Sequence, residues 1–116
     1  MEIKSKKNSE HYIWGEKCDG WHLVKNEDLS IIQERVPSGC SEVRHYHKKS
    51  DQFFFILSGE AEIETDGKKH ILKSQQGIFI PAGTIHKLSN NSEEDLEFTV
   101  TSTPPSHGDR VIIENN

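Results

Sequence analysis

The chain has 116 residues, a net charge of −5 at neutral pH and a hydrophobic content of only 32%. This length fits one domain with a thin core, and the absence of a basic patch with interleaved aromatic residues argues against a nucleic-acid partner. No apolar run approaches the roughly 20 residues that a membrane span needs. Residues 1–10 are mostly polar and do not match a secretory signal, so we expect a cytoplasmic protein with no membrane partner.

Residues 1–11 are expected to form a flexible N-terminal segment, followed by a single domain at 12–116. That domain consists of short runs rich in β-branched and aromatic residues, separated by turn residues, which is typical of the strands of a sandwich or barrel. The predicted strands are residues 12–15, 21–24, 29–36, 42–47, 52–57, 61–65, 70–73, 77–80, 85–89 and 96–101. No run predicts a helix of normal length, so the predicted fold class is all-β.

Turn signals support this division into strands. Asp66-Gly67 lies between two alternating runs and predicts a two-residue type I′ hairpin. Residues 90–92 (Asn-Asn-Ser) supply turn chemistry before the last predicted strand.

The two cysteines, Cys18 and Cys40, fit a reducing compartment, although the sequence leaves a disulfide between them open. Cys40 directly follows Gly39 at a turn. We therefore expect Cys40 to be a small buried or turn residue, with a catalytic thiol as the minority interpretation.

The spacing of histidines and glycines is the most informative feature of the chain. His45 and His47 are two residues apart on a predicted strand, so their side chains share one face. The polar link at 48–51 is expected to reverse the chain and bring Gln52 back beside the two histidines. His86 follows a turn that contains Pro and Gly. The full pattern is Gly39-x5-His45-x-His47-x4-Gln52-x6-Gly59 and then Pro81-x-Gly83-x2-His86-x3-Asn90.

This pattern predicts a metal site. Neutral imidazole is the commonest protein ligand for metals, and an amide oxygen adds a donor without charge, so His45, His47, Gln52 and His86 are the candidate ligands. The alternative for Gln52 is a hydrogen bond to a metal-bound water rather than direct ligation. The other four histidines have no such frame and are expected to be solvated or structural; they are His11, His22, His70 and His107.

The two motifs resemble those of the cupin superfamily of small double-stranded β-helix proteins, over about residues 28–102. The first family motif is matched except that Gln52 stands where the family has Glu, and the second is matched except that Gln75 stands where the family has Gly. The resemblance implies a cupin-like jelly-roll barrel. It does not select one activity, because the fold hosts many chemistries.

A divalent transition metal with open positions (Fe, Mn, Ni or Zn) would suit a small oxygen-rich ligand or substrate. The favoured hypothesis is a metal-dependent enzyme of the oxygenase type. Two alternatives stay open: a Lewis-acid isomerase or lyase, and a non-enzymatic module that binds or senses a small molecule.

Four further residues are candidates for substrate binding. Phe54 and Ile56 share the face of Gln52 and are predicted to form an apolar wall beside the metal. Gln33 and Arg35 share one face of the preceding strand, and if that face is the inner one they would anchor a carboxylate or hydroxyl group. A surface ion pair is the alternative for Arg35.

The strand at 52–57 is apolar on both faces, which predicts that both faces are covered. Phe53, Phe55 and Leu57 would face outward from the barrel. Their cover would be either the arm at 12–24 or a second subunit, and the cupin resemblance favours a homodimer that buries Phe53 or Phe55 with that arm.

Overall fold

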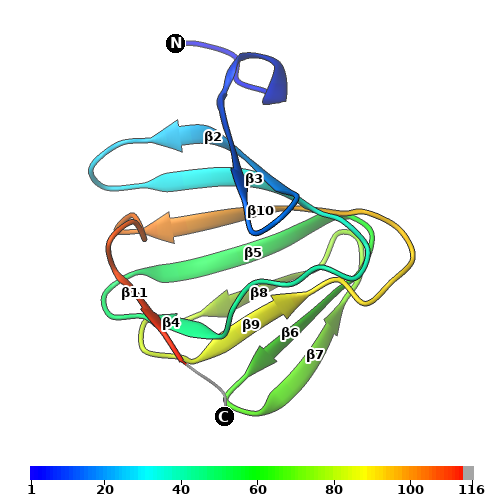
Figure 1. Cartoon of the computed structure of the whole chain (residues 1–116). Coiled ribbons are helices and arrows are strands. Elements are labelled where there is room, and N and C mark those ends of the chain that lie inside the picture. Colours follow the sequence, from blue (N-terminus) through cyan, green and yellow to red (C-terminus); the bar gives the residue numbers. More distant parts are fainter. Residues whose placement is uncertain (114–116) are drawn as a thin grey trace.

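Two antiparallel β-sheets face each other across a shared core in the computed structural model, which describes residues 1–113 (Figure 1). The larger sheet has six strands in the order β1 (Glu10–Trp14), β2 (Cys18–Lys25), β3 (Ser30–Val36), β10 (Leu96–Thr103), β5 (Asp51–Ser58) and β8 (Gly77–Ile80). The smaller sheet has five strands in the order β11 (Arg110–Ile112), β4 (His45–His47), β9 (His86–Ser89), β6 (Ala61–Thr65) and β7 (Lys68–Leu72). The predicted all-β jelly roll is confirmed.

Alternation along the strands builds the core. On β5, Gln52, Phe54 and Ile56 are buried while Phe53 is exposed, as a period of two requires. The neighbouring β10 buries Phe98, whose ring centroid lies 5.7 Å from that of Phe54. The core between the sheets consists of aliphatic and aromatic side chains from both, so each sheet covers the inner face of the other.

The turns follow the predicted chemistry. Asp66 and Gly67 have φ values of 47° and 84°, and positive φ at both central residues is what a type I′ hairpin needs. Gly59 has a φ of 86°, and a Cβ there would lie 2.5 Å from the backbone oxygen of Asp95. A side chain at position 59 would therefore force the β5–β6 turn away from the start of β10.

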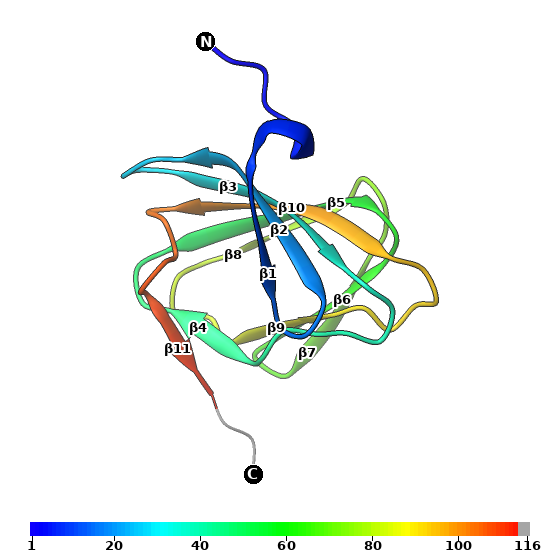
Figure 2. The ribbon, with the colours of Figure 1, turned by 45° about the horizontal axis from the view of Figure 1, so that its top comes forward.

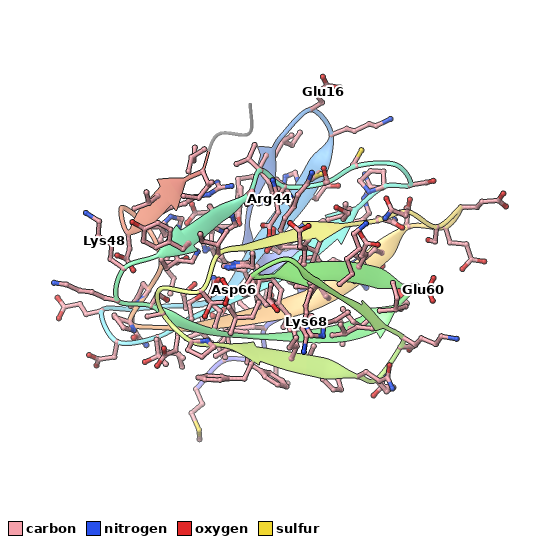
Figure 3. All side chains as sticks on the ribbon, turned by 90° about the horizontal axis from the view of Figure 1, so that it is seen from below. Glu16, Arg44, Lys48, Glu60, Asp66 and Lys68 are labelled. Carbon is pink, nitrogen blue, oxygen red and sulfur yellow. The ribbon has the colours of Figure 1, made fainter. Side chains whose placement is uncertain are left out.

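Charged side chains lie mainly at the outside of the barrel. In Figure 3, Glu16, Lys48 and Glu60 lie at the margins of the molecule, on the turns between strands. Arg44, just before β4, donates from Nε to Glu64 of β6 at 2.8 Å. This ion pair connects two strands of the smaller sheet on its outer side, so it does not enter the core.

The N-terminal region differs from expectation. Strand β1 begins at Glu10, before the predicted boundary, and the turn to β2 lies at residues 15–17 rather than 17–20. Upstream, Lys6–Asn8 form a single 3-10 turn capped by Ser5, and Lys6 pairs with Glu97 at 2.8 Å. Among residues 1–113 this turn is the only helix, and none there could cross a membrane.

Strand β11 was not predicted from the sequence. It pairs only with β4, and its three residues are too few to show a period of two. Asp109 holds this segment in place, because its carboxylate accepts the backbone N–H groups of Lys48, Lys49 and Ser50 at 3.1, 2.9 and 2.8 Å. The chain after β10 is thereby attached to the turn that follows the His45–His47 strand.

The proposed cover of the outer face of β5 is not supplied by the arm. Strands β1 and β2 extend the larger sheet beyond β3, and β10 separates β3 from β5 (Figure 1). Phe53 on β5 is 41% exposed, and its cross-strand neighbour Phe79 on β8 is 57% exposed. A second subunit is the remaining candidate for covering these rings.

Candidate functional site

Three histidine side chains come together on two neighbouring strands of the smaller sheet, β4 and β9. His45 and His47 project from the same face of β4, and His86 on β9 is the cross-strand partner of His45. One ring nitrogen from each of the three lies within 4.8 Å of the others, an arrangement that could hold a metal ion. All three side chains are buried. The sequence-predicted histidines are therefore brought together by the fold.

Backbone carbonyls fix the orientation of two of these rings. Nδ1 of His45 lies 2.7 Å from the Val43 oxygen, and Nδ1 of His86 lies 2.9 Å from the Thr84 oxygen. Since a carbonyl can only accept, each Nδ1 carries the proton and each Nε2 has a free lone pair. The Nε2 atom of His86 is buried with no hydrogen-bond partner. A buried lone pair without a partner fits a metal ligand.

Gln52 comes from the larger sheet and lines the same cavity as His45 and His47. Its Nε2 donates to the hydroxyl of Ser102 on β10 at 3.0 Å, which fixes the amide orientation. Its Oε1 is buried and has no partner. The one atom that an amide can offer to a cation is therefore left free, so the residues fit a site of three nitrogens and one oxygen.

Burial keeps the histidines neutral. Removal from water lowers the pKa of His45 to about 3 and of His47 to about 4, and it lowers the pKa of His86 as well. The neighbouring imidazoles and Arg110 oppose protonation further. Neutral rings are the form that binds a metal, so the site is in its ligating form at neutral pH.

A cavity of about 240 Å³ opens beside these donors. Its apolar surface comes from Ile32, Phe54 and Val100, and its polar surface holds two carboxyl groups and one guanidinium group. The full lining is Tyr12, Trp14, Ile32, Glu34, Glu42, His45, His47, Gln52, Phe54, Val100, Ser106, His107, Gly108 and Arg110. The volume lies somewhat below the roughly 300–1,000 Å³ of typical ligand pockets, so it fits only a small metabolite.

Two of the lining carboxyl groups were missed by the sequence analysis. Burial raises the pKa of Glu34 to about 8, with the nearby Glu42 carboxyl adding to the effect, and burial raises the pKa of Glu42 to about 7. One oxygen of Glu42 accepts the backbone N–H of Leu88 at 2.9 Å, which fixes its position. Glu34 shares the inner face of β3 with Ile32 and Val36, so a period-two count on that strand could have found it.

The predicted substrate-binding residues divide into two groups. Phe54 lines the cavity, whereas Ile56 is fully buried in the core beyond it. Gln33 and Arg35 lie on the outer face of β3, opposite to Ile32 and Glu34. Because their role as substrate anchors required the inner face, the structure does not support it. Arg35 donates to Asp19 at 2.8 Å and to Asp95 at 3.0 Å, which is the surface ion pair considered as the alternative.

The remaining wall of the cavity is formed by both terminal regions. The hairpin β1–β2 lies at the edge of the larger sheet (Figure 2), and Tyr12 and Trp14 of β1 line the cavity. The segment before β11 contributes His107, which is exposed to solvent, as predicted, and also lines the cavity. The buried ring of His22 lies between the two regions, with centroids 5.0 Å from Tyr12 and 5.7 Å from His107.

The two cysteines lie outside this cavity and both are free thiols. Cys18 is buried, and burial together with the neighbouring Cys40 thiol raises its pKa to about 11. Cys40 packs against the core at the turn after β3, as predicted. A thiol with a raised pKa is a poor nucleophile, which argues against a catalytic role for Cys18. Neither cysteine lines the cavity.

Comparison with known proteins agrees with this geometry. The Cupin domain family matches residues 32–102, more than half of the chain. An uncharacterized protein of Methanocaldococcus jannaschii is 32% identical over 94 residues, which are 80% of this chain and 75% of that protein. An oxalate-binding protein of Thermotoga maritima is 31% identical over 82 residues, 66% of this chain and 68% of the relative.

Solved structures show the same fold. KdgF from Halomonas sp. superposes with a TM-score of 0.84 at 18% identity, covering 92% of this chain and 96% of that one. TT1209 from Thermus thermophilus superposes with a TM-score of 0.78 at 25% identity, covering 90% and 98%. With the two motifs, the clustered histidines and the family match all pointing the same way, the chain belongs to the cupin family.

Proposed function

We propose that this cupin is a metal-dependent enzyme that transfers protons within a small oxygen-rich substrate, as an isomerase or lyase does. The observation that carries the proposal is the position of Glu34 and Glu42 in the same cavity as His45, His47 and Gln52. A bound divalent ion would polarise a carbonyl or hydroxyl oxygen of the substrate. The two carboxyl groups are then available to remove and return protons beside that oxygen.

The two carboxyl groups are suited to different roles. With a pKa of about 7, Glu42 is partly ionised at neutral pH and can accept a proton from a carbon next to the polarised carbonyl. With a pKa of about 8, Glu34 is mostly protonated and can deliver a proton to the substrate. Both pKa values are raised from the ordinary value of a carboxyl group to near neutrality by burial, and a pKa near the working pH is what an acid or base catalyst needs.

The oxygenase hypothesis is supported by the apolar part of the cavity lining. Ile32, Phe54 and Val100 give it an apolar wall, and neutral donors suit iron as well as zinc or nickel. The oxygenase remains the second candidate. It makes no use of the paired carboxyl groups, which is why proton transfer is preferred.

Deuterium exchange distinguishes these functions. Protein stripped of metal and reloaded with zinc, nickel, manganese or iron would be incubated in D2O with small 2-oxo acids, hydroxy ketones and diketones. Metal-dependent incorporation of deuterium next to the carbonyl, lost in Glu42→Gln while metal still binds, supports the proposal. Oxygen consumption by the iron form without exchange would favour the oxygenase. Ligand binding without either reaction would favour a binding module, a possibility consistent with the oxalate-binding relative.

A further inference from the structure

The cavity wall divides into two parts that differ in origin. The metal donors, the two carboxyl groups and the apolar side chains all lie within residues 32–102, the part that matches the cupin family. The rest of the wall lies outside that range, on strand β1 and in the segment that leads into β11. These residues are Tyr12, Trp14, Ser106, His107, Gly108 and Arg110. Features particular to this chain should therefore be sought on this terminal wall.

Arg110 lies beside the metal donors. It is the cross-strand partner of His47 in the β4–β11 pair, so the two side chains project from the same face with their Cβ atoms about 5 Å apart. Its charge lowers the pKa values of all three clustered histidines. Within residues 1–113 no carboxylate forms an ion pair with it. Its charge also lowers the pKa values of Glu34 and Glu42, so the guanidinium group lies close to both carboxyl groups without pairing with either, and it lines the cavity where a ligand can reach it.

Trp14 supplies a second unused donor. Its indole Nε1 is buried and has no partner with hydrogen-bond geometry among the described residues. The Glu34 carboxyl is a neighbour of the indole, and hydrogen bonding from the N–H lowers the pKa of Glu34, but the two groups lie outside the geometry of a well-formed hydrogen bond, so a better placed acceptor can replace the carboxyl. A buried donor without a partner is costly, and an acceptor atom on a ligand would relieve that cost.

The position of β1 is maintained by a close approach of ring and backbone. Tyr12 is the cross-strand partner of Gly20 on β2, and a Cβ at position 20 would lie 2.3 Å from the Tyr12 ring. Only glycine lets the ring lie against the strand at this point. The hairpin thus holds Tyr12 and Trp14 against the cavity, although β1 is an edge strand of the larger sheet.

We propose that the terminal wall selects a small anionic oxygen acid, with a carboxylate held by Arg110 and a second acceptor oxygen held by the Trp14 indole N–H. This inference rests on the proposed function in one respect, namely that the remaining oxygen donors of the same molecule reach the metal. Hydroxy and oxo acids of about four to six carbons combine these groups in a size that suits a small cavity.

Binding of a matched pair of compounds tests this selection. L-malate and 1,2,4-butanetriol have the same carbon skeleton, and only malate is anionic. Calorimetry with the zinc-loaded protein should show malate binding at least about tenfold more tightly, as expected for a charge-assisted bond to Arg110. In a Trp21→Phe background Trp14 is the only tryptophan, so malate should also change its fluorescence. Equal binding of the two compounds, or no malate binding by protein that holds zinc, overturns the proposal.

Variants locate the effect on the terminal wall. Arg110→Gln should weaken malate binding by about tenfold or more, with recovery in Arg110→Lys, and Trp14→Phe should weaken it by about threefold to tenfold through loss of one hydrogen bond. Ile13→Ala is the matched control, because Ile13 lies on the opposite, exposed face of β1. Unchanged malate affinity in Arg110→Gln overturns the proposal.

Zinc titration of each variant separates this inference from the proposed function. If zinc does not bind to the wild type, the proposed metal-dependent function fails. Malate binding that depends on Arg110 in the zinc-free protein would still support the proposal that the terminal wall selects an anion. If zinc binds and malate binding does not depend on Arg110, the proposed selection of an anion by the terminal wall is wrong, whereas the proposed metal site is supported.

Discussion

The two ends of the cavity are built in different ways. At the inner end, His45, His86 and Gln52 are buried, and each has one polar atom fixed by a protein hydrogen bond and another left free. At the outer end, Trp14 and Arg110 come from short strands at the edges of the two sheets and are less enclosed. The inner end thus has buried donors held by hydrogen bonds, while the outer end is built from edge strands that leave their side chains more open to solvent.

Removal of a histidine tests this difference between the two ends most strongly. His86→Ala deletes a donor at the buried end, and we expect metal affinity to fall by more than about a hundredfold, beyond the loss typical of residues that only support a ligand. Metal titration of the stripped protein gives the measurement. His70→Ala is the control, because His70 bonds to Thr65 on the β6–β7 hairpin, away from the cavity. Equal losses in both variants would contradict a specific site.

Substitution of Gln52 tests the inner end further by changing its charge. Gln52→Glu should tighten binding of a divalent ion by about tenfold, since a carboxylate attracts the ion more strongly even after its desolvation is considered. The Ser102 hydroxyl can rotate to donate to the new carboxylate. Gln52→Ala should weaken binding or place a water at the position. Equal dissociation constants for wild type and both variants would show a three-histidine site without Gln52.

The buried carboxyl groups predict a pH-dependent stability. Because the folded-state pKa values of Glu34 and Glu42 are raised, their favourable contribution is complete below about pH 4.5 and is lost as the pH rises through about 7 to 8. Glu34→Gln removes this loss, so the metal-free variant should gain about 1–3 kcal/mol over wild type at pH 8.5 and little at pH 4.5. Thermal unfolding at both pH values is the measurement.

A surface substitution serves as the control for that experiment. Glu60→Gln changes the charge at the β5–β6 turn without entering the cavity (Figure 3). A gain for Glu34→Gln that is the same at both pH values would contradict the raised pKa as its cause.

Assembly should have the smallest effect on the cavity. We expect a homodimer that covers the exposed rings of Phe53 and Phe79, with the N-terminal hairpin contributing to the interface. Phe79→Asp should then give the 13.3 kDa monomer in light scattering, with metal affinity unchanged. A wild type that is already monomeric at micromolar concentration would refute the homodimer. A monomeric variant with weakened metal binding would show that the donor end depends on assembly.

The sequence predicted the inner end of the cavity better than the outer end. His45, His47 and His86 come together as the two-residue strand period and the motif predict. Gln52 lines the same cavity, and its role as a ligand stays a prediction. Arg110 could not be found in this way, since a three-residue strand has no measurable period and its pairing with β4 depends on the Asp109 carboxylate.

Strand β3 shows why the sequence did not identify Glu34 as a cavity residue. Ile32 and Val36 mark the inner face by their hydrophobicity, and the same count places Glu34 inside and Arg35 outside. A glutamate on the inner face between two apolar residues is unusual, so Arg35 and Gln33 were the more obvious polar anchors, although all three are half-buried. Burial of Glu34 is set by what the neighbouring hairpin places above it, which no property of β3 alone reveals.

The carbonyl bonds to His45 and His86 have a consequence for the choice of metal. Each ring is oriented by a backbone oxygen two residues upstream, so the nitrogen lone pairs are in place before any ion arrives. A site whose ligands are already oriented cannot favour one ion over another by rearranging around it. Metal occupancy should therefore follow the general affinity order of divalent ions, with copper and nickel ahead of iron and manganese. The ion found in protein from any one source would then reflect the supply of metals in that compartment as much as the preference of the fold.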